Sequence, residues 1–154
     1  MSEKEDLSEL ENMFMNAMKL RQNGEVDSSE KLLHTIIVKE PRLPEPHIEL
    51  AHIYTIAEKY DEAITHINDA ITYLENGGQW LEFEDINLIA MAYLIKGEIY
   101  KSLADQDHIV FGDPNIFEEY IKLSKDAYKK SYELDPSNED AIYWTSEHHW
   151  VIKE

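Results

Sequence analysis

The sequence contains no cysteine, which excludes disulfides, thiolate metal sites and cysteine nucleophiles together. It also lacks any run near the roughly 20 apolar residues that a membrane-spanning helix requires. Basic residues are few, with 14 Lys and Arg against 32 Asp and Glu, so the net charge is −18. Surfaces that bind nucleic acid or anionic lipid need an excess of Lys and Arg. We therefore expect neither nucleic acid nor membrane as a partner.

The first residues, 1–6, are acidic, whereas a secretory signal begins with a basic segment that an apolar one follows. This pattern favours a soluble protein of the cytoplasm. Apolar residues make up 43% of the chain and aromatic residues 10%, which is enough to form a core despite 30% charged residues. We expect a single folded domain over residues 1–154. The acidic excess either attracts a basic partner or only keeps the protein soluble.

An apolar pattern repeats at an interval of 34 residues in the first half of the chain. Met13, Ala17 and Leu20 stand on one stripe of a predicted helix, because they are four and three residues apart. The 34-residue offset relates Met13 to His47, Ala17 to Ala51, Leu20 to Tyr54, Asp27 to Asp61, Ser29 to Ala63, Leu33 to Ile67, Ile36 to Ala70 and Ile37 to Ile71. The pattern predicts two copies of a helical hairpin, and neither copy can bury its apolar face alone.

The second copy resembles the tetratricopeptide repeat (TPR) family. The resemblance is carried by Leu50-Ala51-x-x-Tyr54 and by Tyr60-Asp61-Glu62-Ala63-x-x-x-Ile67-x-x-Ala70. The first copy is looser, with Ser29 where alanine is usual in the family. Small residues such as Ala51 allow close approach of antiparallel helices, and larger ones fill the space between hairpins. The resemblance implies an all-α solenoid of stacked helical hairpins.

A third copy is split by two insertions. Tyr93, Gly97 and Tyr100 follow His47, Ala51 and Tyr54 at an offset of 46, while Ser124, Tyr128 and Ser131 follow Ala63, Ile67 and Ala70 at an offset of 61. The offsets imply 12 inserted residues before the third hairpin and 15 within it. After it, Leu134-Asp135-Pro136-x-Asn138 resembles the exit from a TPR repeat.

The predicted fold is therefore an all-α, TPR-like helical-hairpin solenoid of about seven helices. Its hairpins occupy residues 4–40, 44–76 and 83–135, the third being irregular, and a capping helix covers residues 138–152. Gly24 and Gly77-Gly78 are expected to end helices, and Asp113-Pro114 is expected to begin one.

TPR domains typically bind an extended peptide or a partner helix in a concave groove lined by the first helix of each hairpin. On that resemblance, the groove residues lie one position after the apolar stripe of each first helix. They are Phe14, Met18 and Arg21, then Ile48, His52 and Thr55, then Leu94, Glu98 and Lys101. An exposed apolar strip of this kind marks a partner site. The alternative is that Trp80, the capping helix or a loop fills the groove.

Some TPR domains hold a C-terminal carboxylate with Lys, Arg and Asn side chains, and this sequence departs from that pattern. It offers Glu45, Glu49 and Glu98 instead. A protein or peptide partner with apolar anchors and basic flanks suits such a surface better. The resemblance thus implies an interaction module, either an adaptor or a small chaperone. The alternative is a structural protein that self-assembles through its insertions and aromatic capping helix while its groove stays closed.

The insertion within the third hairpin contains three consecutive apolar residues, Ile109, Val110 and Phe111. They are expected either to fold back over a hydrophobic gap or to act as a recognition loop, and the first reading is preferred. Nearby aspartates, at positions 105, 107 and 113, lack the dense alternation of oxygen ligands and the closing Glu of a calcium loop.

Seven histidines raise the question of metal binding or catalysis. Glu49-x-x-His52 and Glu147-His148-His149 place ligand-type residues close together, but neither matches a known metal motif. His47 is expected to be a partly covered residue between helices. Phosphate-binding loops and the Gly-x-Ser-x-Gly motif are also missing. We expect no metal, no cofactor and no enzymatic activity.

Overall fold

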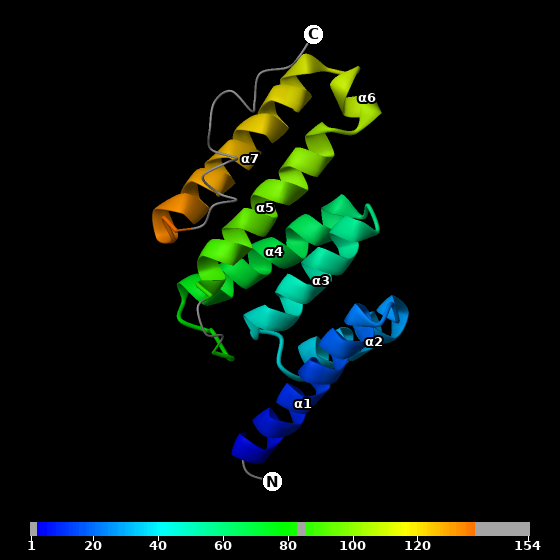
Figure 1. The fold of residues 1–154 in the computed structure, drawn as a ribbon, viewed down its shortest axis with the longest axis vertical. Helices are drawn as coiled ribbons and strands as arrows, with labels where there is room; N and C mark the ends of the chain where they lie inside the picture. Colours follow the sequence, from blue (N-terminus) through cyan, green and yellow to red (C-terminus); the bar gives the residue numbers. More distant parts are fainter. Residues whose placement is uncertain (1–2, 83–85, 138–154) are drawn as a thin grey trace. The chain divides into compact units, whose positions relative to one another are not determined.

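The computed structural model describes residues 3–82 and 86–137, and all of the regular structure within these ranges is helical (Figure 1). The helices are α1 (Glu3–Gln22), α2 (Val26–Lys39), α3 (Pro44–Ile56), α4 (Tyr60–Glu75), α5 (Leu88–Ala104), α6 (Asp107–Val110) and α7 (Pro114–Leu134). The prediction of an all-α fold is confirmed. None of these described helices has both the length and the apolar character needed to cross a bilayer.

The chain forms two compact units that divide between Leu81 and Glu82. In the first unit α1 packs against α2, α2 against α3, and α3 against α4. In the second unit α5 and α7 pack along each other as an antiparallel pair, and the short α6 lies in the connection between them (Figure 1). Helical hairpins are thus the building blocks of both units. Their stacking into one solenoid domain over residues 1–154 stays a prediction.

The turns that join the two helices of each hairpin in the first unit have the same backbone conformation. Gly24, with φ 84°, and Glu58, with φ 61°, both adopt the left-handed region and are 34 residues apart. The hydrogen bonds that close the two turns are Glu25 N to Leu20 O and Lys59 N to Tyr54 O, each of 2.8 Å. Both helices therefore end in the Schellman arrangement, and the 34-residue repeat of the sequence is also a repeat of backbone geometry.

We expect Glu58→Gly to raise the free energy of unfolding by about 0.5 to 1 kcal/mol, because a residue with a Cβ is strained at positive φ and glycine is not. The matched control is Gly24→Ala, which should lower stability by a similar amount. Nothing lies within 4 Å of a Cβ at Gly24, so this control reports on the backbone alone. Urea denaturation followed by circular dichroism measures both changes. A loss of stability in Glu58→Gly would contradict the assignment of strain to this turn.

A second repeated feature is a hydrogen bond from a buried serine to the backbone of the paired helix. Ser29 Oγ donates to Ala17 O in the first hairpin, and Ser124 Oγ donates to Gly97 O in the pair of α5 and α7, both at 2.7 Å. By the repeat offsets, Ser124 corresponds to Ser29 and Gly97 corresponds to Ala17. Ser131 Oγ makes a third such bond, of 2.7 Å, to Ala90 O. The equivalent bonds support the assignment of α5 and α7 as a third hairpin that an insertion splits.

Gly97 differs from the alanines at the corresponding positions of α1 and α3 because its partner is larger. A Cβ at Gly97 would lie 2.8 Å from Cδ1 and 2.9 Å from Cε1 of Tyr128, which is fully buried. Tyr128 occupies the repeat position that Ile67 has in the second hairpin. The absence of a methyl group on α5 therefore makes room for the larger ring on α7.

Side-chain caps set the ends of two helices in the second unit. Asn87 Oδ1 accepts a hydrogen bond of 3.1 Å from Ala90 N, so α5 begins at Leu88 and not at residue 83 as the sequence suggested. Asp113 Oδ1 accepts one of 2.9 Å from Asn115 N, which confirms the predicted start of a helix there. The short α6 was not expected, and the expected capping helix at 138–152 lies outside the described residues.

Candidate functional site

Two apolar residues of the expected groove are buried in the structure. Phe14 on α1 is 2% exposed and Ile48 on α3 is 4% exposed. The rings of Trp80 and Phe14 meet in a T-shaped arrangement, with centroids 5.9 Å apart and an interplanar angle of 62°. The prediction that Phe14 and Ile48 form an exposed strip is therefore wrong. For Phe14, the alternative expectation that Trp80 covers it is what the structure shows.

Glu45 holds the segment that carries Trp80. This residue lies in the first turn of α3, is buried, and accepts hydrogen bonds at Oε2 from Trp80 N at 2.9 Å and Leu81 N at 2.6 Å. Its other oxygen, Oε1, is buried and has no hydrogen-bond partner among the described residues. Burial raises the pKa of Glu45, and the backbone N–H donors only partly oppose this effect. Glu45 is thus an internal tether and is not a residue of an open groove.

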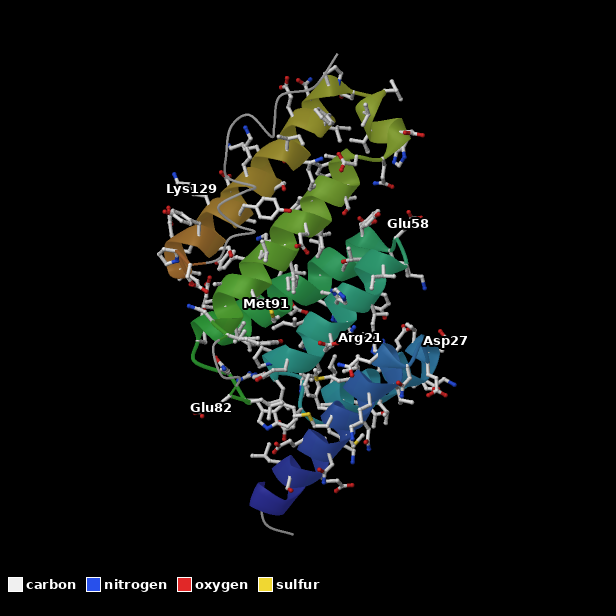
Figure 2. All side chains as sticks on the ribbon, in the orientation of Figure 1. Arg21, Asp27, Glu58, Glu82, Met91 and Lys129 are labelled. Carbon is white, nitrogen blue, oxygen red and sulfur yellow. The ribbon has the colours of Figure 1, made fainter. Side chains whose placement is uncertain are left out.

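The polar residues expected in the groove of the first unit have different environments. Arg21, labelled in Figure 2, extends from the last turn of α1, and its Nε lies 2.7 Å from Glu49 Oε2 on α3. Thr55 Oγ1 donates to Ala51 O of its own helix at 2.6 Å. His52 is exposed and Met18 is partly exposed. The structure therefore pairs Arg21 within the chain, so that its charge is largely compensated by Glu49.

The three expected groove residues of the second unit all lie on α5. Leu94 is partly exposed and Glu98 is exposed. Lys101 Nζ lies 2.6 Å from Asp105 Oδ1, one helical turn further along. Lys101 is thus compensated by a neighbour on its own helix, as a surface pair of this spacing commonly is.

The apolar insertion within the third hairpin faces solvent. Phe111, directly after α6, is 85% exposed, which is the largest exposed fraction among the exposed large apolar side chains of the described residues. Val110 is also exposed and Ile109 is partly exposed. The preferred expectation, in which these residues fold back over a gap, is wrong for Phe111 and Val110. The short α6 packs against α7 and α5, and Phe111 and Val110 stay in solvent beside these contacts.

A cluster of ligand-type side chains joins α3 to α4, and the sequence analysis did not predict it. His47 Nδ1 lies 2.9 Å from His66 Nδ1, and His47 Nε2 lies 2.9 Å from Pro41 O. Asp69 is near both rings, since one potential ligand atom from each of the three residues lies within 4.8 Å of the others. The available signal was His66-x-x-Asp69, which places two ligands on one helical turn. His47 belongs to a different predicted helix, and nothing in the sequence indicates that it lies near His66 and Asp69.

A second set of hydrogen bonds borders the cluster. Tyr54 OH donates to Glu30 Oε1 at 2.8 Å and lies 2.9 Å from His34 Nε2, while its ring stacks on His66 with centroids 5.6 Å apart. Burial and the nearby Glu30 raise the pKa of Tyr54 to about 12, so the hydroxyl keeps its proton and continues to donate. Burial, with further contributions from His47 and His34, lowers the pKa of His66.

No protein-family model matches this chain, and no curated protein matches it. A function for this chain is therefore inferred from the contacts, burial and charge of its described residues.

Proposed function

We propose that this chain is a TPR-like protein-interaction module of the cytoplasm, acting as an adaptor or small chaperone. Its contact surface is the α6 tip, which we define as Ile109, Val110, Phe111 and Ile116. The partner is a protein that presents an apolar pocket flanked by Lys or Arg. The single observation that carries this proposal is the 85% exposure of Phe111.

Phe111 has the properties of an interface anchor. Its side chain is exposed in the free chain, and burying a side chain of this size in a partner contributes about 1.5 to 3 kcal/mol. Aromatic residues are also enriched at the centres of protein interfaces. Val110 and Ile116 are exposed as well, and α6 packs against the helix that carries Ile116. Together these side chains form exposed apolar surface, which is unfavourable in water and typically marks a site of interaction with a partner.

Charge around the α6 tip favours a basic partner. Asp107 and Asp113 are exposed in this part of the chain, whereas the exposed Asp105 is paired with Lys101. The net charge of the whole chain is −18. Opposite charges around an apolar contact accelerate association and select among partners. A partner with basic flanks therefore fits this surface better than an acidic one.

The TPR-like assignment is supported by two repeats of geometry. The left-handed turn residues, Gly24 and Glu58, recur at the 34-residue interval, and the buried serine bonds recur between the first and third hairpins. The groove used by TPR domains is a poorer candidate here, because Phe14 and Ile48 are buried. We therefore propose the α6 tip in place of the groove.

Affinity capture from the native cell tests this proposal with wild type, Phe111→Ser and a matched control, Val38→Ser. Val38 is 81% exposed on α2, so both substitutions remove an exposed apolar side chain without creating a cavity in the core. We expect the control to capture the same proteins as wild type. Phe111→Ser should bind the captured partner about tenfold more weakly, or by more, which corresponds to about 1.4 kcal/mol. The affinity should also fall with added salt.

Identical binding by all three proteins would exclude the α6 tip as the contact surface. Capture of no specific protein by wild type would argue against an interaction module. Light scattering covers the structural alternative: a concentration-dependent oligomer of wild type that Phe111→Ser disrupts would identify a second copy of this chain as the occupant of the tip.

A further inference from the structure

The nitrogen atoms of two histidines on neighbouring helices face each other within the first unit. His47 on α3 is buried, His66 on α4 is partly buried, and their Nδ1 atoms are 2.9 Å apart. Asp69 follows His66 by one turn of α4. Its carboxylate completes a group whose potential ligand atoms all lie within 4.8 Å of one another. Two imidazoles and a carboxylate thus converge on one point between α3 and α4.

The backbone fixes the tautomer of His47. Its Nε2 lies 2.9 Å from the carbonyl oxygen of Pro41, which can only accept, so Nε2 carries the hydrogen and donates it. In the neutral ring Nδ1 is then unprotonated, and its lone pair is directed at His66. An imidazole whose other nitrogen donates to a backbone carbonyl is the usual arrangement of a metal-ligating histidine.

The ring of His66 is held in place by two aromatic neighbours. It stacks on Tyr54, with an interplanar angle of 26°, and lies 5.2 Å from the His47 ring between centroids. Without a metal, His66 Nδ1–H donates to His47 Nδ1. To hold a metal through both Nδ1 atoms, His66 would have to carry its hydrogen on Nε2 instead, which would leave both Nδ1 lone pairs available.

We propose that His47, His66 and Asp69 form a binding site for a divalent transition-metal ion of the zinc class. The donor set decides the class: imidazole nitrogens favour zinc and its neighbours, whereas calcium and magnesium prefer sets made of oxygen alone. Glu62 and Asp69 add negative charge near His66, which favours any cation there. With three protein ligands, a tetrahedral ion keeps a fourth position for water or for a partner's side chain.

The two imidazole nitrogens need only a small adjustment to hold an ion. Zinc–nitrogen bonds of about 2.0 to 2.1 Å place two nitrogens of a tetrahedral site about 3.3 Å apart. The 2.9 Å separation of the Nδ1 atoms therefore has to widen by a few tenths of an ångström, within the freedom of the two side chains. A bound ion would link α3 to α4 and stabilise the first unit, because it binds the folded chain and not the unfolded one.

Calorimetric titration of the metal-free chain with Zn²⁺ tests the site. The starting protein carries His148→Gln and His149→Gln, because these adjacent histidines are potential ligands outside the described residues. We expect one Zn²⁺ per chain, a rise in melting temperature with added Zn²⁺, and no binding of Ca²⁺ or Mg²⁺. Co²⁺ in place of Zn²⁺ should give the visible absorption of a tetrahedral site, which reports directly on the ligands.

His66→Gln and Asp69→Asn should each weaken Zn²⁺ binding by about tenfold or more. The matched control is His52→Gln, which changes an exposed histidine of α3 and should leave the affinity unchanged. Circular dichroism checks that each variant is folded, and Asp69→Asn, at a partly exposed position, tests the site even if His66→Gln unfolds. Unchanged affinity in both variants would overturn the proposal, as would a starting protein that does not bind Zn²⁺.

Discussion

Replacing Gly97 by alanine should lower the free energy of unfolding by about 2 kcal/mol, although alanine is by itself the better helix former by about 1 kcal/mol. The reason is the 2.8 Å distance from the new Cβ to Cδ1 of Tyr128, well inside normal carbon–carbon contact. Tyr128 is fully buried, so its ring cannot swing into solvent to relieve the clash. The overlap must instead separate α5 from α7 or strain the ring. Chemical denaturation followed by circular dichroism measures the loss.

A second substitution identifies the clash as the cause. The second hairpin has Ala51 and Ile67 at the positions of Gly97 and Tyr128, and both are buried there. Tyr128→Ile alone should destabilise, since it removes a large buried ring. In the Gly97→Ala background, the loss of stability caused by Tyr128→Ile should be smaller by about 1 kcal/mol or more. The added methyl group then fills space that the ring vacated. A double-mutant cycle with no coupling would contradict the account.

Glu45→Ala is the other substitution with a large expected effect, a loss of about 2 kcal/mol in the free energy of unfolding. It removes the acceptor for two backbone N–H groups, that of Trp80, which is part-buried, and that of Leu81, which is buried. The segment that covers Phe14 is then no longer held to α3. Trp80 fluorescence should move toward the spectrum of an exposed indole, measured in a chain that carries Trp144→Phe and Trp150→Phe so that only this tryptophan emits.

The matched control is Glu45→Gln, which keeps an oxygen acceptor and removes the charge. Because the pKa of Glu45 is raised above its ordinary value of 4.5, protonation favours the folded chain. The extra stability that protonation of Glu45 contributes is fully present below pH 4.5 and is lost as the pH rises through the higher folded pKa. Glu45→Gln should therefore gain stability relative to wild type between acidic and neutral pH. A difference that does not change with pH would show that burial does not perturb this carboxyl group.

The helical hairpins could be predicted from the sequence because their signals are local. Small residues and large apolar residues recur at an interval of 34 residues. Gly24 and the Asp113-Pro114 pair mark helix ends through backbone preferences of the residues themselves. Glu58 was harder to recognise, since only its tertiary position in a repeated turn reveals that it adopts φ 61° without being glycine. The start of α5 was also missed, because the cap formed by Asn87 competes with an apolar pattern that begins earlier.

The candidate sites could be predicted less well, because each depends on side chains brought together from distant positions. Sequence alone assigned Phe14 to an open groove, but Trp80 covers it from the segment after α4, and Glu45 holds that segment. The sequence also could not decide whether the segment around Phe111 folds back, which depends on whether another element faces it.

The sequence by itself determined that this protein is acidic and helical and is built from hairpins, because composition, periodicity and turn residues act over a few neighbouring positions. Only the tertiary structure decided which surfaces are open. It buried Phe14, exposed Phe111, and brought His47 to His66 and Asp69 across two helices. Burial and ligand geometry depend on contacts between residues far apart in the chain, and a repeat interval specifies which positions correspond without specifying what covers them.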